Sequence, residues 1–494
     1  MKKSTSPFNL KKYLKLQKAA ILERIDQFDG KLYLEFGGKL FDDKHASRVL
    51  PGFKEDSKIA VLQELKNKLE IIICINSYDI ITGKVRNDTS LSYEDEVFRM
   101  IDILKANKLF VSSVVITKYQ DVASVRAFRH YLESFKIKTY ATYEIENYPQ
   151  DVDLILSEEG FGKNDFIETT KPLVVVTAPG PGSGKMQLCL SLLYQDSLLN
   201  KRSGYAKYET FPTWNLGINH PINLAYEAAT LDLDDELMID HYYLASTKQE
   251  AVSYNRDLQS FSLLKKTLTK IYGESPYNSP TEMGVNKVGF AIDDEEQIRI
   301  ACEQEIIRRY YQALWQYKLG VLNIKAINKI NDIMDRGNID KNDRKVVSRA
   351  LKKYEDTNLP SAALSLANNK IVTGKRTKLF TQAAAAIINA LKAYAHINKE
   401  IPLLSESIIT TIQNTKREHL HEEEPALNVN EVLIALAITA NTGPISEVAL
   451  RQIPKLNGNQ MHSSHVIDQS DLVTLHKLGI DVTFEPQAEN IFRK

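Results

Sequence analysis

The residues best suited to chemistry form a glycine-rich run that ends in a lysine. The run reads APGPGSGKM at 178–186 and directly follows the apolar segment Leu173–Thr177. Glycines let the backbone curl so that successive N–H groups point to one side, and a helix beginning there adds unpaired N–H groups and a partial positive charge. Such a loop can cradle a phosphate group. The residues predicted to hold it are Gly180, Gly182, Ser183, Gly184 and Lys185.

The spacing of this run is that of a P-loop, G-x-x-x-x-G-K-[ST], with two departures. Pro179 stands where the first glycine is expected, and Met186 stands where a P-loop has the Ser or Thr that binds Mg²⁺. The loop does not identify a cofactor: a nucleotide is compatible with it, and so is Mg²⁺, which would have to be held without the usual hydroxyl. The alternative interpretation is a tight turn between a strand and a helix, without a ligand.

Three residues are candidates for a catalytic role, namely Lys185, Glu158 and Glu35. Glu158 follows the apolar segment 152–156, which is where a P-loop protein carries the acid of its second motif. The alternative for Glu158 is an ordinary acid at the end of a buried strand. Glu35 precedes a second glycine turn, Gly37-Gly38, which also follows an apolar segment.

That second turn is a candidate ligand loop. Ligands collect at the carboxyl ends of the strands in an open parallel sheet, so the two glycine turns could face one crevice. A plain turn with surface charges is the alternative. The residues of this second candidate loop are Gly37, Gly38, Lys39, Asp42, His45 and Arg48.

Other groups of residues give weaker indications of a ligand or metal site. The segment 205–209 interleaves Tyr, Lys and Glu, which suits either ligand contact or a half-exposed strand. His462 and His465 form an H-x-x-H pair, but the chain has no H-E-x-x-H, and we predict no metal site. The three cysteines, spaced by more than a hundred residues and without C-x-x-C, are expected to be buried thiols of a reduced compartment.

The segments that must position these residues alternate between strand and helix patterns up to about residue 225. This alternation predicts a mostly parallel α/β sheet that carries the P-loop-like turn. The predicted strands are 33–36, 71–75, Val111–Thr117, 139–145, 152–156, Leu173–Thr177 and 204–211, with a helix from Lys185.

Beyond this region the pattern changes twice, so that three parts are predicted. An α/β part (1–225) is followed by a mostly helical part (226–350), in which 223–272 shows no convincing strand. An α+β part (351–494) begins with a hairpin of 362–367 and 370–373 around Asn368-Asn369, since Asn tolerates positive φ.

Composition narrows the choice of partners. The chain has 494 residues, with 63 Lys plus Arg and 63 Asp plus Glu, so its formal net charge is zero. Proteins held by bulk charge on nucleic acid or an anionic membrane carry a basic excess, so neither partner is expected. No signal peptide or long apolar run is present, and we expect a cytoplasmic protein. The expected partner is a phosphorylated small molecule, and a homo-oligomer is compatible with the sequence.

Three motifs of the chain resemble a bacterial family of uncharacterised proteins, the domain of unknown function 1846 (uncharacterised protein family 0371). They are YLEFGGKLFDD (33–43), APGPGSGKM (178–186) and NLAYEAAT (223–230), and the resemblance extends from Phe8 to Ile480. It implies a multidomain cytoplasmic protein with an α/β part and two further parts, one of them helical. It implies no established activity.

Three functional hypotheses remain open at this point. The first is an enzyme that binds a nucleotide or another phosphorylated small molecule and transfers a phosphoryl or nucleotidyl group, with Lys185 neutralising the charge that develops. The second is a non-catalytic sensor of a phosphorylated metabolite, in which Met186 marks lost metal chemistry. The third is a structural or oligomeric protein whose glycine loop is only a turn.

Overall fold

The structure is a computed structural model that describes residues 6–86, 90–233, 235–367 and 370–487. The chain divides into two compact units, Met1–Cys302 and Glu303–Lys494. The division into three parts at 225 and 350 stays a prediction. Helix α9 (Pro221–Ala229) spans the first of these positions.

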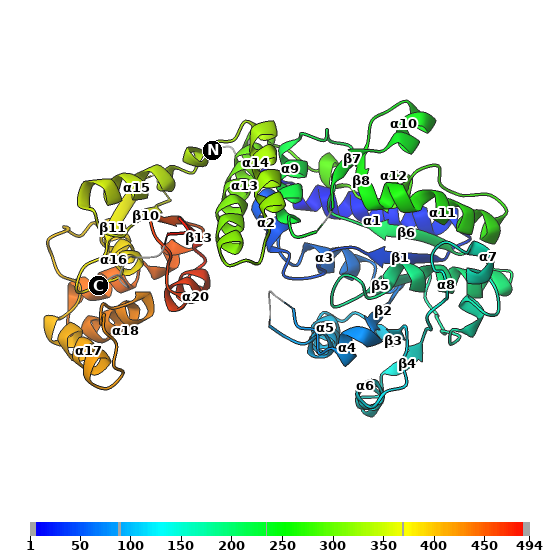
Figure 1. The fold of residues 1–494 in the computed structure, drawn as a ribbon, viewed down its shortest axis with the longest axis horizontal. Coiled ribbons are helices and arrows are strands. Elements are labelled where there is room, and N and C mark those ends of the chain that lie inside the picture. The colour runs from blue at the N-terminus through cyan, green and yellow to red at the C-terminus, as the bar shows by residue number, and fades with distance from the viewer. Residues whose placement is uncertain (1–5, 87–89, 234, 368–369, 488–494) are drawn as a thin grey trace. The chain divides into compact units, whose positions relative to one another are not determined.

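The first unit is built on a seven-stranded sheet with the order β4-β3-β2-β5-β1-β6-β9. Every pair of neighbouring strands is parallel. Figure 1 shows the strands in this order, from β6 beside α1 to β4 beside α6. In chain order the strands are β1 (Leu32–Phe36), β2 (Leu69–Asn76), β3 (Val111–Thr117), β4 (Lys138–Ala141), β5 (Leu173–Thr177), β6 (Gly204–Tyr208) and β9 (Gly284–Val285).

The apolar composition of the central strands explains their position. All five residues of β5 are buried, and so are seven of the eight residues of β2. Runs of β-branched residues that are buried on both faces are typical of parallel sheets. The predicted parallel α/β sheet is confirmed, and β3 and β5 have the predicted bounds.

The topology brings three strand ends together. Strand β5 lies between β1 and β2, and β1 lies between β5 and β6. Glu35 of β1 is in register with Val176 of β5 and with Lys207 of β6. The carboxyl ends of these three strands are therefore level, and the loops that follow them leave the sheet at one edge.

Helices surround this sheet, and α1, α5 and α8 contact its strands. The helices of the first unit are α1 (Leu10–Gln27), α2 (Lys44–Val49), α3 (Ser57–Glu64), α4 (Ser77–Ile81), α5 (Tyr93–Ala106), α6 (Ala123–Ser134), α7 (Val152–Ile155), α8 (Lys185–Leu198), α9, α10 (His241–Thr247), α11 (Asn255–Tyr272) and α12 (Pro280–Met283).

Two local predictions are wrong. The segment 152–156 is not a buried strand but the short helix α7, whose first turn is capped by Asp151, since its side chain accepts a hydrogen bond of 3.0 Å from the N–H of Leu154. An apolar run of this length fits a strand and a helix turn equally well. The region 223–272 does contain strands, since β7 (Leu237–Ile239) and β8 (Val252–Tyr254) form an antiparallel pair.

The second unit has a separate mixed sheet of four strands in the order β11-β10-β12-β13. The predicted hairpin is confirmed by the antiparallel pairing of β10 (Ser361–Ser365) with β11 (Ile371–Lys375), while its turn residues Asn368 and Asn369 lie outside the described residues. Strand β12 (Gln460–Ser463) pairs antiparallel with β10 and parallel with β13 (Asp481–Phe484).

Helix α13 (Glu295–Lys318) contains the boundary between the two units. The helices of the second unit that follow it are α14 (Ile324–Gly337), α15 (Lys345–Thr357), α16 (Gln382–Tyr394), α17 (Glu406–Glu418), α18 (Val429–Ala440), α19 (Pro444–Leu450) and α20 (Gln469–Lys477). Among the residues that the structure describes, no helix combines the length and the apolar character needed to cross a membrane.

Candidate functional site

The glycine loop joins the carboxyl end of β5 to the first residue of α8. Helix α8 begins at Lys185, as predicted, and its N-cap is Gly184, which has φ +85°. A side chain at this position would be strained, and its Cβ would lie 3.1 Å from Oγ1 of Thr117. The glycine therefore allows the loop to turn into the helix directly against the end of β3.

Side chains from outside the loop hold its first half. The Nη1 atom of Arg86 donates a hydrogen bond of 2.6 Å to the carbonyl oxygen of Pro179. The ring of Tyr93 packs against Gly180 so closely that a Cβ there would lie 2.2 Å from the tyrosine hydroxyl. The position of Gly180 is thus fixed by the first residue of α5.

The carbonyl groups in the second half are held in the same way. Thr117 Oγ1 donates a hydrogen bond of 2.9 Å to the carbonyl of Ser183, and Asn76 Nδ2 donates one of 3.4 Å to the carbonyl of Gly182. The hydroxyl of Ser183 donates to the carbonyl of Gly180 over 3.0 Å. These contacts come from the ends of β2 and β3 and turn the loop's acceptors toward the protein.

The N–H groups of the loop behave differently. In the described part of the chain, the N–H groups of Gly180 and of residues 182–187 donate no hydrogen bond to a protein acceptor. Five of these residues are partly or fully exposed, namely Gly180, Gly182, Gly184, Lys185 and Met186. The loop thus offers a run of backbone donors at the positive end of a 14-residue helix, with its acceptors tied down.

The charges of Lys185 and Glu35 influence the pKa values of the same two buried thiols, those of Cys74 and Cys189. Burial raises the pKa of Cys74 to about 12, while the ammonium of Lys185 acts to lower it and the carboxylate of Glu35 acts to raise it. Burial also raises the pKa of Cys189, with Lys185 and Glu35 acting in the same opposite directions. The structure therefore brings these two sequence candidates into one electrostatic environment. All three cysteines are buried, as predicted.

A network of charges joins the two glycine loops. Glu96 of α5 is fully buried and accepts hydrogen bonds from Arg86 Nη1 over 3.2 Å and from Arg99 Nη1 over 3.0 Å. Arg99 also forms an ion pair with Asp42, and Arg86 reaches Pro179. Asp42 of the second loop is thereby linked to the first loop through an arginine–glutamate–arginine chain.

The other residues of the second candidate loop lie in two places: Gly37, Gly38 and Lys39 follow β1, and His45 and Arg48 lie on α2. Gly37 and Gly38 lie at the sheet edge, where the N–H of Gly37 donates to the carbonyl of Tyr208 over 2.9 Å. Lys39 is exposed, and its carbonyl accepts a hydrogen bond of 2.8 Å from Lys58 Nζ.

His45 and Arg48 belong to α2, which packs against α9. The ring of His45 lies 5.2 Å from that of Phe211 and 5.8 Å from that of Tyr226. Of the six residues predicted for the second candidate loop, Gly37 and Gly38 therefore lie at the end of β1, next to the glycine loop 178–185.

A cluster of acids beside Gly37 adds to the site. Lys207 of β6 and Asp257 of α11 form a largely buried ion pair of 2.7 Å. Burial raises the pKa of Glu209 to about 7; Lys207 opposes this shift, whereas Asp257 and Glu35 add to it. A Cβ on Gly37 would lie 3.3 Å from Cγ of Glu209, so the glycine leaves room for this side chain. A carboxyl group with a pKa near neutrality can accept and release a proton at physiological pH.

Glu158 is not brought to this edge. It is exposed in the turn after α7. Its carboxylate contributes to the raised pKa of Tyr194, which lies near the other end of α8. Nine residues of helix separate Tyr194 from Lys185, which corresponds to about 13 Å along the axis. The misjudged strand 152–156 explains why sequence reasoning placed Glu158 beside the loop.

The histidines singled out from the sequence have protein partners. His462 Nδ1 lies 2.9 Å from Thr483 Oγ1, and His465 Nδ1 lies 2.9 Å from Ser464 Oγ. Within the described ranges, no group of three or more His, Cys, Asp or Glu side chains is arranged to hold a metal ion. The H-x-x-H pair thus belongs to the interior of the second unit.

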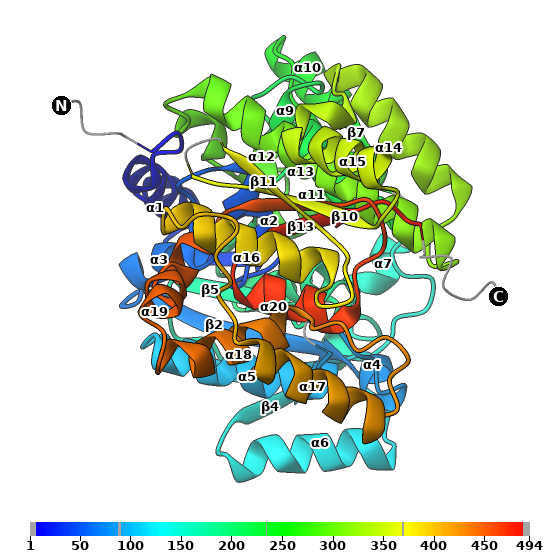
Figure 2. The ribbon, with the colours of Figure 1, turned by 90° about the vertical axis from the view of Figure 1, so that its left-hand side faces the viewer.

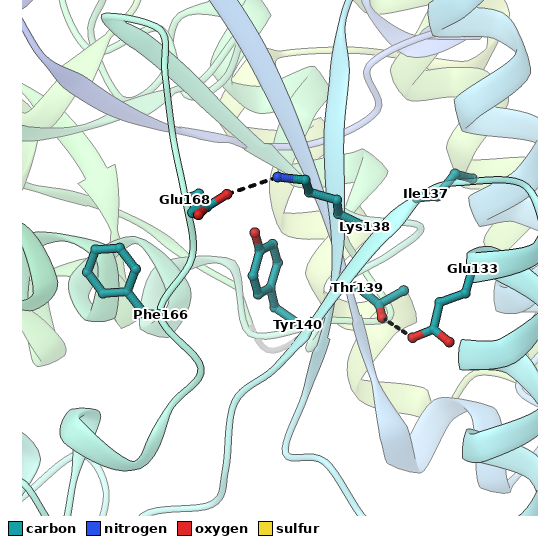
Figure 3. Close-up of a pocket in the computed structure, with 7 residues that line it drawn as sticks. All are labelled: Glu133, Ile137, Lys138, Thr139, Tyr140, Phe166 and Glu168. Atoms are coloured by element: carbon teal, nitrogen blue, oxygen red, sulfur yellow. Dashed lines mark hydrogen bonds and ion pairs between the residues drawn. The ribbon is translucent and has the colours of Figure 1, made fainter.

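A hollow of about 400 Å³ lies at the edge strand β4, away from the glycine loops. Figure 3 shows that both of its carboxylates have partners: Lys138 pairs with Glu168 over 2.9 Å, and the hydroxyl of Thr139 donates to Glu133 over 2.9 Å. The contacts at the carboxyl edge of the sheet, rather than this hollow, identify the candidate site.

Sequence reasoning did not single out the residues that contact the site from other elements, namely Asn76, Arg86, Tyr93, Glu96, Thr117 and Asp257. Arg86, Glu96 and Asp257 belong to no motif, and only their contacts reveal them. Glu209 lies in the segment 205–209, where the interleaved Tyr, Lys and Glu gave the one signal that could have identified it.

Comparison with known proteins agrees with the resemblance noted in the sequence. Two family models match the chain, "Domain of unknown function DUF1846, N-terminal" over residues 6–338 and "Domain of unknown function DUF1846, C-terminal" over residues 342–492. A UPF0371 protein of Streptococcus pneumoniae serotype 19F (strain G54) is 50% identical over 489 residues, which cover 99% of each chain. A UPF0371 protein of Streptococcus pneumoniae (strain Hungary19A-6) is 49% identical over the same length and shares.

Proposed function

The chain belongs to the DUF1846 family, whose description states no activity, and we propose that it binds a nucleotide or another phosphorylated small molecule at the glycine loop 178–185. One observation carries the proposal. The carbonyls of Pro179, Gly182 and Ser183 are held by side chains of the protein, whereas the N–H groups of Gly180 and residues 182–187 have no acceptor among the described residues.

This arrangement suits a phosphate for electrostatic reasons. Unpaired N–H groups at a helix start carry partial positive charge, and an anion placed there gains several hydrogen bonds at once. Lys185 begins the helix and would add a full charge to the same group. The N–H groups of residues 184–187 would be unpaired at any helix start, and those of Gly180, Gly182 and Ser183 extend this run of donors into the loop.

The acid cluster supports an enzymatic form of the proposal. Glu209 follows β6, Ala178 follows β5, and β1 lies between them, so the strand spacing separates their backbones by about 10 Å. A ligand with its phosphate at the loop could therefore place a hydroxyl near Glu209. That carboxylate would take the proton of the hydroxyl as the hydroxyl oxygen bonds to phosphorus and the bond from phosphorus to the leaving oxygen of the ligand breaks. The rest of the ligand would leave with the electrons of that bond and take a proton from water, while Lys185 neutralises the charge that develops on the phosphate oxygens.

Met186 bears on the role of a metal. It occupies the second position of α8 and offers no hydroxyl for Mg²⁺. We therefore propose that phosphate binding at this loop does not depend on Mg²⁺ held in the standard P-loop manner. A non-catalytic sensor uses the same loop without the proton step, and it remains the second form of the proposal.

A thermal-shift screen tests the binding site. Inorganic phosphate, nucleotides and sugar phosphates are added to the full-length chain with and without Mg²⁺. A ligand present at 100 times its Kd should stabilise the chain by about 2.7 kcal/mol. The Lys185→Ala variant should lose this shift, and Lys201→Ala, an exposed lysine just beyond the other end of α8, should keep it. If no phosphate compound shifts the midpoint, or both variants respond equally, the site is wrong.

Turnover separates the enzyme from the sensor. A ligand found in the screen is incubated with the protein and an excess of a hydroxyl acceptor or water, and its phosphorus resonances are followed by NMR. An enzyme should convert the ligand, and Glu209→Gln should slow the conversion while leaving the thermal shift in place. Binding without conversion over many hours would favour the sensor.

A further inference from the structure

The second unit holds a hollow of about 630 Å³, a volume typical of small-molecule sites. It lies on α15 and at the start of β11, which Figure 2 shows beside each other. The residues that line it are Lys345, Ser348, Arg349, Lys352, Lys370 and Ile371. Four of the six are cations, and none is an acid.

Apolar contacts fix the two walls of the hollow relative to each other. Val346 and Ala350 on the inner face of α15 are buried with Ala363 of β10, and Ile371 of β11 packs against this cluster. The cations on the outer face of α15 thus stand on a helix that cannot shift along β11 without breaking the cluster. Their backbone positions are set before any ligand arrives.

The cations of α15 are not neutralised within the protein. Lys345, Arg349 and Lys352 are spaced by four and three residues, which places them on one face of the helix, and all three are exposed. No ion pair joins any of the three to an acid in the described part of the chain. Lys370 lines the opposite wall. In a chain with zero net charge, this is a local excess.

We propose that this hollow binds a small molecule that carries two or more phosphate groups. Seven residues of helix separate Lys345 from Lys352, or about 10 Å along the axis, a length over which two or three linked phosphates can be contacted at once. Arg349 in the middle can grip one phosphate through two parallel hydrogen bonds, and the lysines supply point charges on either side. The proposal is independent of the glycine loop.

The charges around the hollow favour a compact ligand over a nucleic acid strand. Asp356 lies one turn beyond Lys352 on the same face of α15, and Asp343 precedes the helix. Acids at both ends of the basic row would repel a polyanion that continued along the helix. A ligand that ends within the hollow avoids them.

Calorimetric titration with sodium tripolyphosphate tests the proposal. The experiment uses the full chain carrying Lys185→Ala, so that the glycine loop does not contribute and the two proposals fail separately. In this background, Arg349→Gln/Lys352→Gln should weaken binding at least tenfold. The control Lys325→Gln/Lys477→Gln removes the same charge from exposed sites elsewhere in this unit and should bind within twofold of the parent. A Lys370→Gln variant should weaken binding from the other wall.

Two outcomes would overturn the proposal. One is equal affinity of tripolyphosphate for the Arg349→Gln/Lys352→Gln variant and the control, which would show that bulk charge alone attracts the anion. The other is tighter binding of a single-stranded oligonucleotide than of tripolyphosphate, abolished in the same variant, which would assign the basic face to nucleic acid. Unchanged unfolding curves without ligand establish that each variant is folded.

Discussion

Nη1 of Arg86 lies 2.6 Å from the carbonyl oxygen of Pro179, and the same atom lies 3.2 Å from Oε1 of Glu96. One arginine nitrogen therefore connects the glycine loop to a buried carboxylate. Because the side chain of Glu96 is almost fully buried, its charge requires the two arginines that flank it. The loop's shape thus depends on an ion cluster that belongs to a different helix.

Replacing Arg86 should loosen the loop. Arg86→Met removes one of the cations from Glu96 and the donor from Pro179, and we expect a loss of about 2–3 kcal/mol in unfolding free energy, measured with urea. Phosphate binding should weaken about tenfold, since the loop donors lose their fixed position. Arg126→Met, which removes an exposed pair with Asp121, is the matched control and should leave stability nearly unchanged. Equal effects of the two variants would contradict the anchoring role of Arg86.

Two glycines of the loop should respond differently to alanine. In Gly180→Ala the new methyl group meets the ring of the buried Tyr93, and we expect a destabilisation of about 2 kcal/mol or more. Gly182 has φ +79° and open space around its Cβ position, so Gly182→Ala should cost only about 1 kcal/mol of backbone strain. Urea unfolding of both variants checks the order. If Tyr93→Ala does not relieve the effect of Gly180→Ala, the close packing at Gly180 is not its cause.

Glu209 should make stability depend on pH near neutrality. Its pKa is about 7 in the folded chain because of burial and the carboxylates of Asp257 and Glu35, against about 4.3 in an unfolded chain. The folded state therefore holds a proton that the unfolded state releases, and unfolding free energy should fall as pH rises from about 4.5 to 7. Glu209→Gln should remove this fall and be more stable than wild type at pH 8. The exposed Glu23→Gln is the control, and a parallel pH profile for Glu209→Gln and wild type would refute the assignment.

His462 should produce the opposite slope at lower pH. Burial, together with the charges of Arg344 and Lys341, lowers its pKa to about 3. The unfolded chain takes up this proton near pH 6.5 and the folded chain does not, so unfolding free energy should fall by up to about 1.4 kcal/mol per pH unit below pH 6.5. His462→Asn should reduce the slope, whatever its own stability, while the exposed His130→Asn should not. The slopes come from urea midpoints between pH 4 and pH 8.

The elements that the sequence predicted best are those with unambiguous patterns. The bounds of β3 and β5 match because β-branched runs end at polar or glycine-rich residues. The segment 152–156 was misjudged because a run of five residues carries no periodicity that separates a strand from a helix turn. Strands β7 and β8 escaped notice because each has only three residues.

In the candidate site too, features with a local sequence signal could be predicted and features that depend on distant contacts could not. The start of α8 at Lys185 follows from the glycine spacing alone, because the signal is local. The contact of Arg86 with Pro179 spans 93 residues, and that of Lys207 with Asp257 spans 50. Contacts of this kind depend on strand order, which one sequence does not reveal. The charge count also could not show the basic face of α15, since acids elsewhere cancel it.

The central place of β5 has a consequence for how the first unit is made. Strand β5 pairs with β1 and β2, both of which precede it by a hundred residues or more. A chain still in synthesis, and complete only to residue 172, has β1 to β4 but lacks the strand that joins the two halves of the sheet. Its exposed strand edges are sites for aggregation, and such long-range pairing makes folding slow. The two halves are joined only when β5 enters between β1 and β2, so the glycine loop that follows β5 is ordered by the step that joins them, before β6 and β9 extend the sheet.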